Sequence, residues 1–80
     1  MSKQITWEQF RGVVCEHLGL TETEIKEATD IYRDIGLDSL GIVSLGMKLQ
    51  SEFQITIPLY EIPIMQTVGD MYQKLLEYIQ

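Results

Sequence analysis

The side chains that could do chemistry in this sequence do not assemble into a known catalytic motif. Gly36 and Gly41 have the spacing of a phosphate-binding loop, but Ile42 follows where that motif needs lysine. Ser39, Leu40 and Gly41 match half of a nucleophile elbow, yet no strand is expected before them. Ser39 also has no base of its own. The sequence therefore predicts a protein that is not an enzyme.

The counts of cysteine and histidine exclude an internal disulfide and a Cys/His zinc cluster. Cys15 is the only cysteine and His17 the only histidine, so one chain can form neither a disulfide nor a Cys/His zinc cluster. We interpret Cys15 as a part-buried thiol and His17 as a cation near the C-terminus of a helix. No long apolar run follows Lys3, so we expect a soluble, cytoplasmic protein with no signal peptide or membrane span.

The charge balance indicates the kind of partner. Six Lys and Arg stand against 12 Asp and Glu, which gives a net charge of -6 and a pI near 4.5. Nucleic acid and anionic membranes are therefore poor partners, and a basic protein surface is the natural complement. The acid is concentrated in residues 22–38, which include Asp34 and Asp38. That segment is either a solvated loop or a docking surface for a basic partner.

Helical periodicity must supply the scaffold that positions these groups. At 80 residues the chain predicts a single domain, 1–80, with a small core. Thr6 and Gln9 form a capping box, which predicts a helix over 7–18 that ends at Gly19. Residues 20–38 predict a long ordered loop with a short helical turn around 22–26.

A second helix is predicted over 39–53, with Asp38 as a possible N-cap. Gly46 on its buried side allows a neighbouring segment to approach closely. One stripe of this helix belongs to the core and consists of Ile42, Leu45, Leu49 and Phe53. A second apolar line, which we expect to be partly exposed, consists of Leu40, Val43 and Met47.

The remaining residues predict a short third helix and a longer last one. Residues 55–58 are extended, 59–62 form one short helical turn, and Pro63 ends or kinks it. A final amphipathic helix starts near Thr67 and continues to the C-terminus. The pattern as a whole predicts an all-α bundle.

One stretch of the sequence resembles the acyl carrier protein family. The stretch from Asp34 to Leu40 reads Asp-Ile-Gly-Leu-Asp-Ser-Leu and is followed by an apolar helix, and residues 55–58 read Ile-Thr-Ile-Pro. The resemblance also covers Gly19, the length of the loop and residues 67–70, which together span nearly the whole chain. It implies a small four-helix bundle with a long loop between helices one and two and a short third helix. It also implies a covalent 4'-phosphopantetheine arm, derived from coenzyme A, on Ser39.

The resemblance also implies how the arm is added and used. Asp38 can cap the helix and leave the Ser39 hydroxyl free, so that a phosphopantetheinyl transferase esterifies it. Acyl-loading and synthase enzymes with basic or apolar surfaces would then dock, and we expect the carrier to be a monomer. The expected contact residues are Asp34, Asp38, Leu40, Val43 and Met47. A saturated chain could tuck into a pocket formed by Ile42, Leu45, Ile57, Ile62 and Met65.

The sequence departs from the family pattern along the second helix. Fatty-acid carriers usually have an aspartate after Ser-Leu and a glutamate three positions later, where this chain has Gly41 and Ser44. The helix carries only Lys48 and Glu52 and is electrically neutral. This favours a specialised carrier, as in polyketide synthesis. Two alternatives stay open: an aminoacyl or peptidyl carrier, and a helical adaptor in which Ser39 is only a cap.

Overall fold

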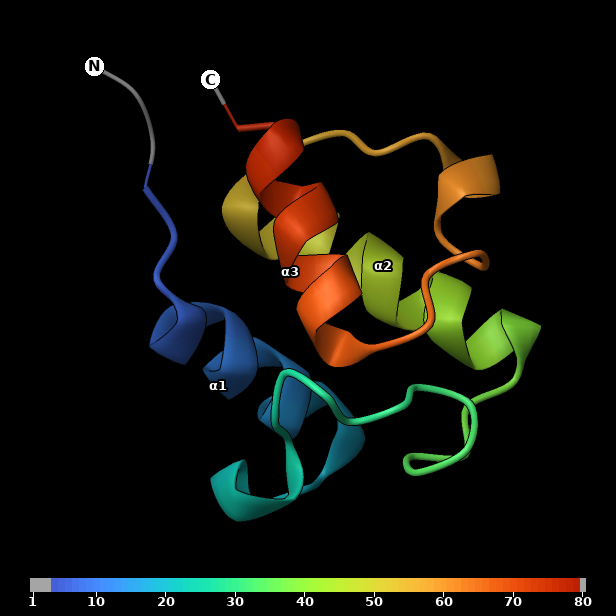
Figure 1. Ribbon diagram of the computed structural model, residues 1–80. Coiled ribbons are helices and arrows are strands. Elements are labelled where there is room, and N and C mark those ends of the chain that lie inside the picture. The colour runs from blue at the N-terminus through green and yellow to red at the C-terminus, as the bar shows by residue number, and fades with distance from the viewer. Residues whose placement is uncertain (1–3, 80) are drawn as a thin grey trace.

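The structure is a computed structural model that describes residues 4–79 (Figure 1). Within that range the chain is helical and contains no strand. Its elements are α1 (Trp7–Leu18), the 3-10 turn η1 (Glu22–Glu24), α2 (Ser39–Phe53), the 3-10 turn η2 (Leu59–Glu61) and α3 (Val68–Glu77). The predicted all-α class is confirmed.

Local hydrogen bonds at the helix ends agree with the sequence signals. The Gln9 amide donates to the Thr6 hydroxyl at 3.1 Å and the Thr6 amide donates to the Gln9 side chain at 2.9 Å, which is the predicted capping box. Gly19 ends α1 in the left-handed conformation, with φ 69°. The start of α2 is fixed in the same local way, because the Asp38 carboxylate accepts from the Gly41 amide at 2.7 Å.

The core lies where the three α-helices meet. Its apolar side chains are at most 8% exposed and are Ile5, Phe10, Val14, Cys15, Ile25, Ile31, Ile42, Leu45, Leu49, Ile57, Ile62, Met65, Val68, Met71 and Leu75. The α2 face predicted to be buried therefore lies in the core, with Phe53 only partly buried at its end. Aromatic rings of Trp7, Phe10 and Tyr72 join α1 to α3, with centroids 5.2 to 5.6 Å apart.

The long loop before α2 is held by the start of α3. The Ile31 amide donates to the Gln66 carbonyl, the Val68 amide to the Thr29 carbonyl and the Gly69 amide to the Glu27 carbonyl, each at 2.9 Å. A Cβ on Gly69 would lie 2.8 Å from the Glu27 carbonyl oxygen, so glycine is required there. These three bonds satisfy backbone groups that the loop cannot pair by itself, and they order the segment that leads to Ser39.

Two predictions about the later part of the chain need qualification. The third helix is only the three-residue turn η2, because Pro63 lacks an amide hydrogen and cannot continue a helix. A four-helix bundle is therefore not confirmed: residues 4–79 hold three α-helices and two 3-10 turns.

The predicted extension of the last helix to the C-terminus is wrong for the described residues. α3 ends at Glu77, and the amides of Tyr78 and Ile79 bond three residues back, to Leu75 and Leu76. Such bonds tighten the last turn and end the α-helical ladder. Gln80, which the prediction included, lies outside the described residues.

Candidate functional site

Ser39 is an exposed residue at the first position of α2. Its neighbour Asp38 performs the capping, since the Asp38 carboxylate accepts from the Gly41 amide. Among residues 4–79, the Ser39 hydroxyl takes part in no hydrogen bond. A serine at a helix start usually serves as the cap itself. Here Asp38 has taken that role, so the Ser39 hydroxyl is available for chemistry.

Two glycines, Gly36 and Gly41, shape the backbone on either side of Ser39. Gly36 turns the chain with φ 85°, a conformation that favours glycine, and the Leu37 amide then donates to the Ile31 carbonyl at 3.2 Å. A Cβ on Gly41 would lie 3.2 Å from both the Asp38 carboxylate and the Leu37 side chain. The first turn of α2 therefore leaves its amides and the positive end of its dipole beside Ser39, which favours an anionic group there.

The Asp30 carboxylate, which the sequence analysis missed, holds the part of the loop that leads to α2. The Asp30 carboxylate accepts from the amides of Tyr32 at 2.9 Å and Arg33 at 2.7 Å, and from the Gln66 side chain at 2.5 Å. The bond from the Arg33 amide, followed by that from Gln66, lowers the pKa of Asp30 below its ordinary value. Asp34 in turn accepts from the Asp30 amide at 2.8 Å. In the sequence Asp30 is marked only by its Asp-x-x-x-Asp spacing from Asp34, and that spacing does not predict a bond to Gln66, which is 36 residues away.

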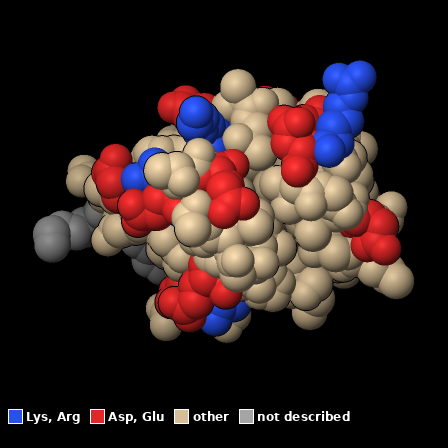
Figure 2. Space-filling model, turned by 90° about the horizontal axis from the view of Figure 1, so that it is seen from below, with Lys and Arg blue, Asp and Glu red and all other residues tan. Residues whose placement is uncertain are grey.

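The acidic groups of this region are spread out. Seen from the side of the loop, carboxylates outnumber basic groups and stand in separate groups with uncharged surface between them (Figure 2). Glu24 has a lowered pKa because it accepts hydrogen bonds from Thr21, and Asp30 has one because it accepts from the Arg33 amide and from the Gln66 side chain. Asp34 and Asp38 are exposed but also hold the backbone. These four loop acids thus serve the fold, and a role in docking remains a prediction.

The apolar line of α2 lies beside Ser39. Leu40 is 82% exposed and Met47 is 57% exposed, while Val43 is half-buried against the core. The only charges of α2 pair with each other, with Lys48 Nζ 3.6 Å from the Glu52 carboxylate. The outer face of α2 is therefore apolar and locally neutral, as the sequence indicated.

The residues predicted to hold an acyl chain all belong to the core, and none is more than 5% exposed. Ile42 and Leu45 come from α2, and the others from the segment between α2 and α3. Ile62 lies directly on the α2 backbone, since a Cβ on Gly46 would be 2.6 Å from its Cδ1 atom. An acyl chain could enter here only by displacing packed side chains, and the pocket remains a prediction.

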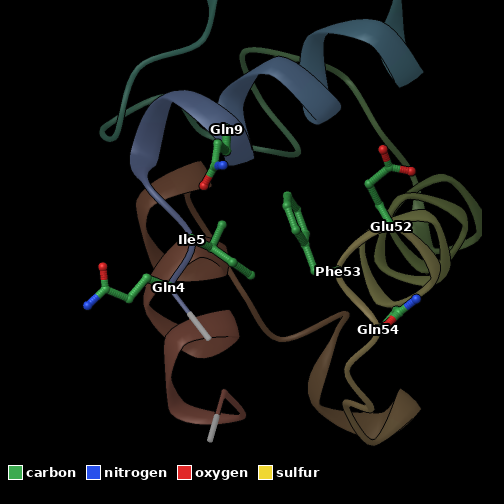
Figure 3. Close-up of a pocket in the computed structure, with 6 residues that line it drawn as sticks. All are labelled: Gln4, Ile5, Gln9, Glu52, Phe53 and Gln54. Carbon is green, nitrogen blue, oxygen red and sulfur yellow. The ribbon is translucent and has the colours of Figure 1, made fainter. Parts of the chain in front are cut away.

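A surface hollow of about 270 Å³ lies elsewhere (Figure 3). In Figure 3 Ile5 and Phe53 point into it, and the side chains around them are mostly polar. Ser39 and Phe53 are the first and last residues of α2, so about 21 Å of helix separates the hollow from the serine. The hollow is therefore not the acyl pocket that the sequence predicted.

Cys15 is buried, somewhat more than expected, and His17 lies in the last turn of α1 as predicted, while the positive charge of His17 stays a prediction. Cys15 is 8% exposed, and burial, followed by the charge of Glu22, raises its pKa. The His17 ring lies 3.4 Å from the Ser44 hydroxyl, at the contact between α1 and α2. The described part of the chain holds no cluster of three or more potential metal ligands. Over the same residues, no helix has the length and apolar character that crossing a membrane requires.

A small helical domain that presents an exposed serine hydroxyl at a helix start, with no base hydrogen-bonded to it in the described residues, has the features of a carrier domain. Residues 8–75 match the family described as "Phosphopantetheine attachment site". The chain is 37% identical over 67 residues to an acyl carrier protein of Clostridium acetobutylicum, covering 84% of this chain and 87% of that protein. It is 38% identical over 65 residues to an acyl carrier protein of Wolinella succinogenes, covering 81% and 86%.

The chain belongs to the acyl carrier protein family. Its members are carriers, not catalysts, and they hold 4'-phosphopantetheine covalently. The thiol at the end of that group supplies the chemistry, because it holds the cargo as a thioester. The residues at the start of α2 fit such a group: Ser39 offers a free hydroxyl, and the amides of the first turn that Asp38 does not pair suit a phosphodiester.

Proposed function

We propose that this chain carries acyl intermediates as thioesters on a 4'-phosphopantetheine arm attached to Ser39, for fatty acid or polyketide biosynthesis. The observation that carries the proposal is the division of roles at the start of α2. Asp38 caps the helix and Ser39 is exposed. The two other serines of the described chain, Ser44 and Ser51, lie within α2 and lack a helix start. Ser2 lies outside the described residues.

The arm must be added by a separate enzyme, because no base is hydrogen-bonded to Ser39 in the described residues and the adjacent Asp38 carboxylate is engaged in capping α2. A phosphopantetheinyl transferase would transfer the phosphopantetheine group from coenzyme A, so that the serine oxygen forms the new phosphoester bond and adenosine 3',5'-bisphosphate leaves. The carrier would act as a cytoplasmic monomer of one domain, 1–80. Its negative charge of -6 supports a partner with a basic surface and argues against nucleic acid.

The site assignment is tested by intact-mass spectrometry. The protein is incubated with coenzyme A and a broad-specificity phosphopantetheinyl transferase, and the mass gain is measured. We expect one arm on the natural chain and none on Ser39→Ala, with the same far-UV circular dichroism for both. The matched control is Ser44→Ala, which should gain the arm like the natural chain. A mass gain on Ser39→Ala would refute the assignment.

We further propose that partners dock chiefly through the apolar line of Leu40, Val43 and Met47. The internal pair of Lys48 and Glu52 leaves α2 without free charge, and the exposed apolar groups lie next to the arm. Asp34 and Asp38 would add negative charge at the N-terminal end. This surface supports a specialised pathway, such as polyketide synthesis, since a carrier for standard fatty-acid enzymes would be expected to bear acidic residues along this helix.

The docking proposal predicts that Met47→Glu weakens partner binding more than Glu52→Lys does. Met47 is 57% exposed, so the change should leave folding intact while it places a charge in an apolar contact. The measurement is kcat/KM of the transferase or a cognate synthase for each variant, at low and high salt. Apolar docking predicts little dependence on salt. Equal losses for the two variants, or a larger loss for Glu52→Lys, would contradict it.

Loading assays separate the carrier classes. The arm-bearing protein is offered acyl and aminoacyl donors with their loading enzymes, and the thioester is detected by mass. An acyl carrier should take the acyl group only. Loading with amino acids alone would instead favour the aminoacyl or peptidyl carrier, and failure to gain the arm at all would favour the helical adaptor.

A further inference from the structure

The segment between α2 and α3 makes, in its middle at residues 58–65, no backbone-to-backbone hydrogen bond to the rest of the described chain. In Figure 1 it leaves the end of α2, runs outward to η2 and returns to α3. The backbone bonds donated within residues 58–65 are all internal to that stretch, for example from Ile62 to Leu59 at 3.2 Å and from Met65 to Ile62 at 3.3 Å. Such a segment can open without breaking any helix.

Side chains of Tyr32, Lys74 and Tyr78 bond to the middle of this segment at two residues, Pro63 and Glu61. The Tyr32 hydroxyl donates to the Pro63 carbonyl. Glu61 is bound at both of its oxygens: Lys74 Nζ lies 3.1 Å from Oε1, and the Tyr78 hydroxyl donates to Oε2. Only 17% of the Glu61 side chain is exposed. Bonds from these two partners, Tyr78 first, lower the pKa of Glu61, so the carboxylate is charged at neutral pH.

The residue after Glu61 closes the proposed acyl pocket. Ile62 is fully buried, and its side chain covers Gly46 so closely that a Cβ on Gly46 would be 2.6 Å from Ile62 Cδ1. An acyl chain passing between α2 and this segment must push Ile62 away from Gly46. Because Glu61 and Ile62 are adjacent, the bonds that fix Glu61 also limit how far Ile62 can move.

We propose that Glu61 is a positioning residue that controls entry of the acyl chain: its bonds to Tyr78 and Lys74 hold Ile62 against Gly46, and their release lets the chain displace Ile62. The inference rests on the proposed arm at Ser39. According to this inference, residues outside the pocket, at the end of α3, help to determine which acyl groups are sequestered. Short chains would stay outside, and long chains would enter only when their burial outweighs the loss of these bonds.

The test compares Glu61→Gln with a matched control, Glu77→Gln. Glu77 is the other partner of Lys74, at 3.5 Å, but its side chain is 64% exposed, and it forms no hydrogen bond or ion pair with η2 in the described residues. Both changes remove the same charge. Each protein is given the arm and a series of saturated acyl chains of increasing length, mass spectrometry verifies the load, and the melting temperature is measured for every form.

In Glu61→Gln we expect the form with the arm alone to melt at a lower temperature, and the rise on adding a long acyl chain to be larger than in the natural protein. If opening becomes about tenfold easier, the rise grows by roughly 6–11 °C in a domain of this size. Glu77→Gln should show the natural rise. Tyr78→Phe, which removes the other bond to Glu61, should behave like Glu61→Gln.

Hydrogen exchange gives a second readout that does not depend on cargo. The amides of Ile62 and Met65 should exchange faster in Glu61→Gln and Tyr78→Phe, and at the natural rate in Glu77→Gln. If Glu61→Gln lowers the melting temperature of all forms equally, Glu61 is merely structural and the proposal is wrong. If no form shows a rise with chain length, the proposal also fails. A missing arm in the mass spectrum would overturn the Ser39 assignment as well, which separates the two failures.

Discussion

Gly46→Ala is the change that tests the packing of α2 most directly. A Cβ at this position would lie 2.6 Å from Ile62 Cδ1, 3.1 Å from Cγ2 and 3.3 Å from Cγ1. Rotation of the terminal methyl relieves only the first of these contacts, so the Ile62 side chain as a whole must shift. Overpacking of this kind costs about 1–3 kcal/mol.

The same change also removes a helix-weakening glycine, which by itself contributes about 0.8–1.0 kcal/mol of stability. Gly12→Ala isolates that gain, because Gly12 lies inside α1 and a Cβ there meets nothing within 4 Å. We therefore expect Gly12→Ala to stabilise by about 1 kcal/mol and Gly46→Ala to destabilise by roughly 0–2 kcal/mol. The two variants should then differ by about 4–24 °C in melting temperature.

The assay is thermal and urea unfolding of both single variants, followed by the double variant Gly46→Ala/Ile62→Val. The valine lacks the Cδ1 atom that makes the closest contact, so the two changes should be less harmful together than the sum of each alone. If Gly46→Ala stabilises as much as Gly12→Ala, then Ile62 does not rest on the α2 backbone, and the account of how the acyl pocket is closed is refuted.

Three further predictions concern the supports of the site. Asp38→Ala should lower the free energy of unfolding by about 1 kcal/mol in urea titrations, while Asp38→Asn, which keeps an acceptor for the helix amide, should lower it much less. Gly69→Ala should lower the melting temperature more than Gly46→Ala does, because a main-chain carbonyl 2.8 Å away cannot rotate aside; an equal or smaller loss would count against the bond between loop and α3. The bond from the Tyr78 hydroxyl lowers the pKa of Glu61 below 4.5, so its stabilisation is complete above pH 4.5 and is lost as the pH falls through the lowered pKa. Melting temperatures between pH 6 and pH 3 should fall less steeply for Glu61→Gln, with Asp30 contributing the same acid dependence to both proteins; parallel curves would contradict the role of Glu61.

Features that depend on a few adjacent residues could be predicted from the sequence. The bounds of α1 and α2 follow from Thr6, Gly19 and Asp38, each of which acts within three or four residues of itself. The buried stripe of α2 follows from spacing alone. The free hydroxyl of Ser39 follows from the same logic, since an adjacent aspartate can replace serine as the cap.

Features that depend on distant partners could not be predicted in this way. In the sequence Asp30 only interrupts the apolar pattern of residues 20–38, but its carboxylate binds the Gln66 side chain, and the Ile31 amide bonds to the Gln66 carbonyl. The bonds of Glu61 to α3 were missed for the same reason. The overlong last helix came from extending a good amphipathic pattern through Ile79, although no local signal such as glycine or proline marks its end.

The pairing of the long loop with the start of α3 also has a consequence for synthesis of the chain. The ribosome makes Asp34 to Ser39 well before it makes Gln66, Val68 and Gly69, whose backbone groups pair with the loop. A nascent chain can therefore form α1 and expose the serine while the turn leading to it is still without its partners. The surface that a transferase would bind is complete only when Gln66, Val68 and Gly69 have emerged and paired with the loop. If the arm is attached at Ser39 as proposed, its attachment should require the residues at the start of α3, and fragments that end before α3 should be poor substrates of the transferase.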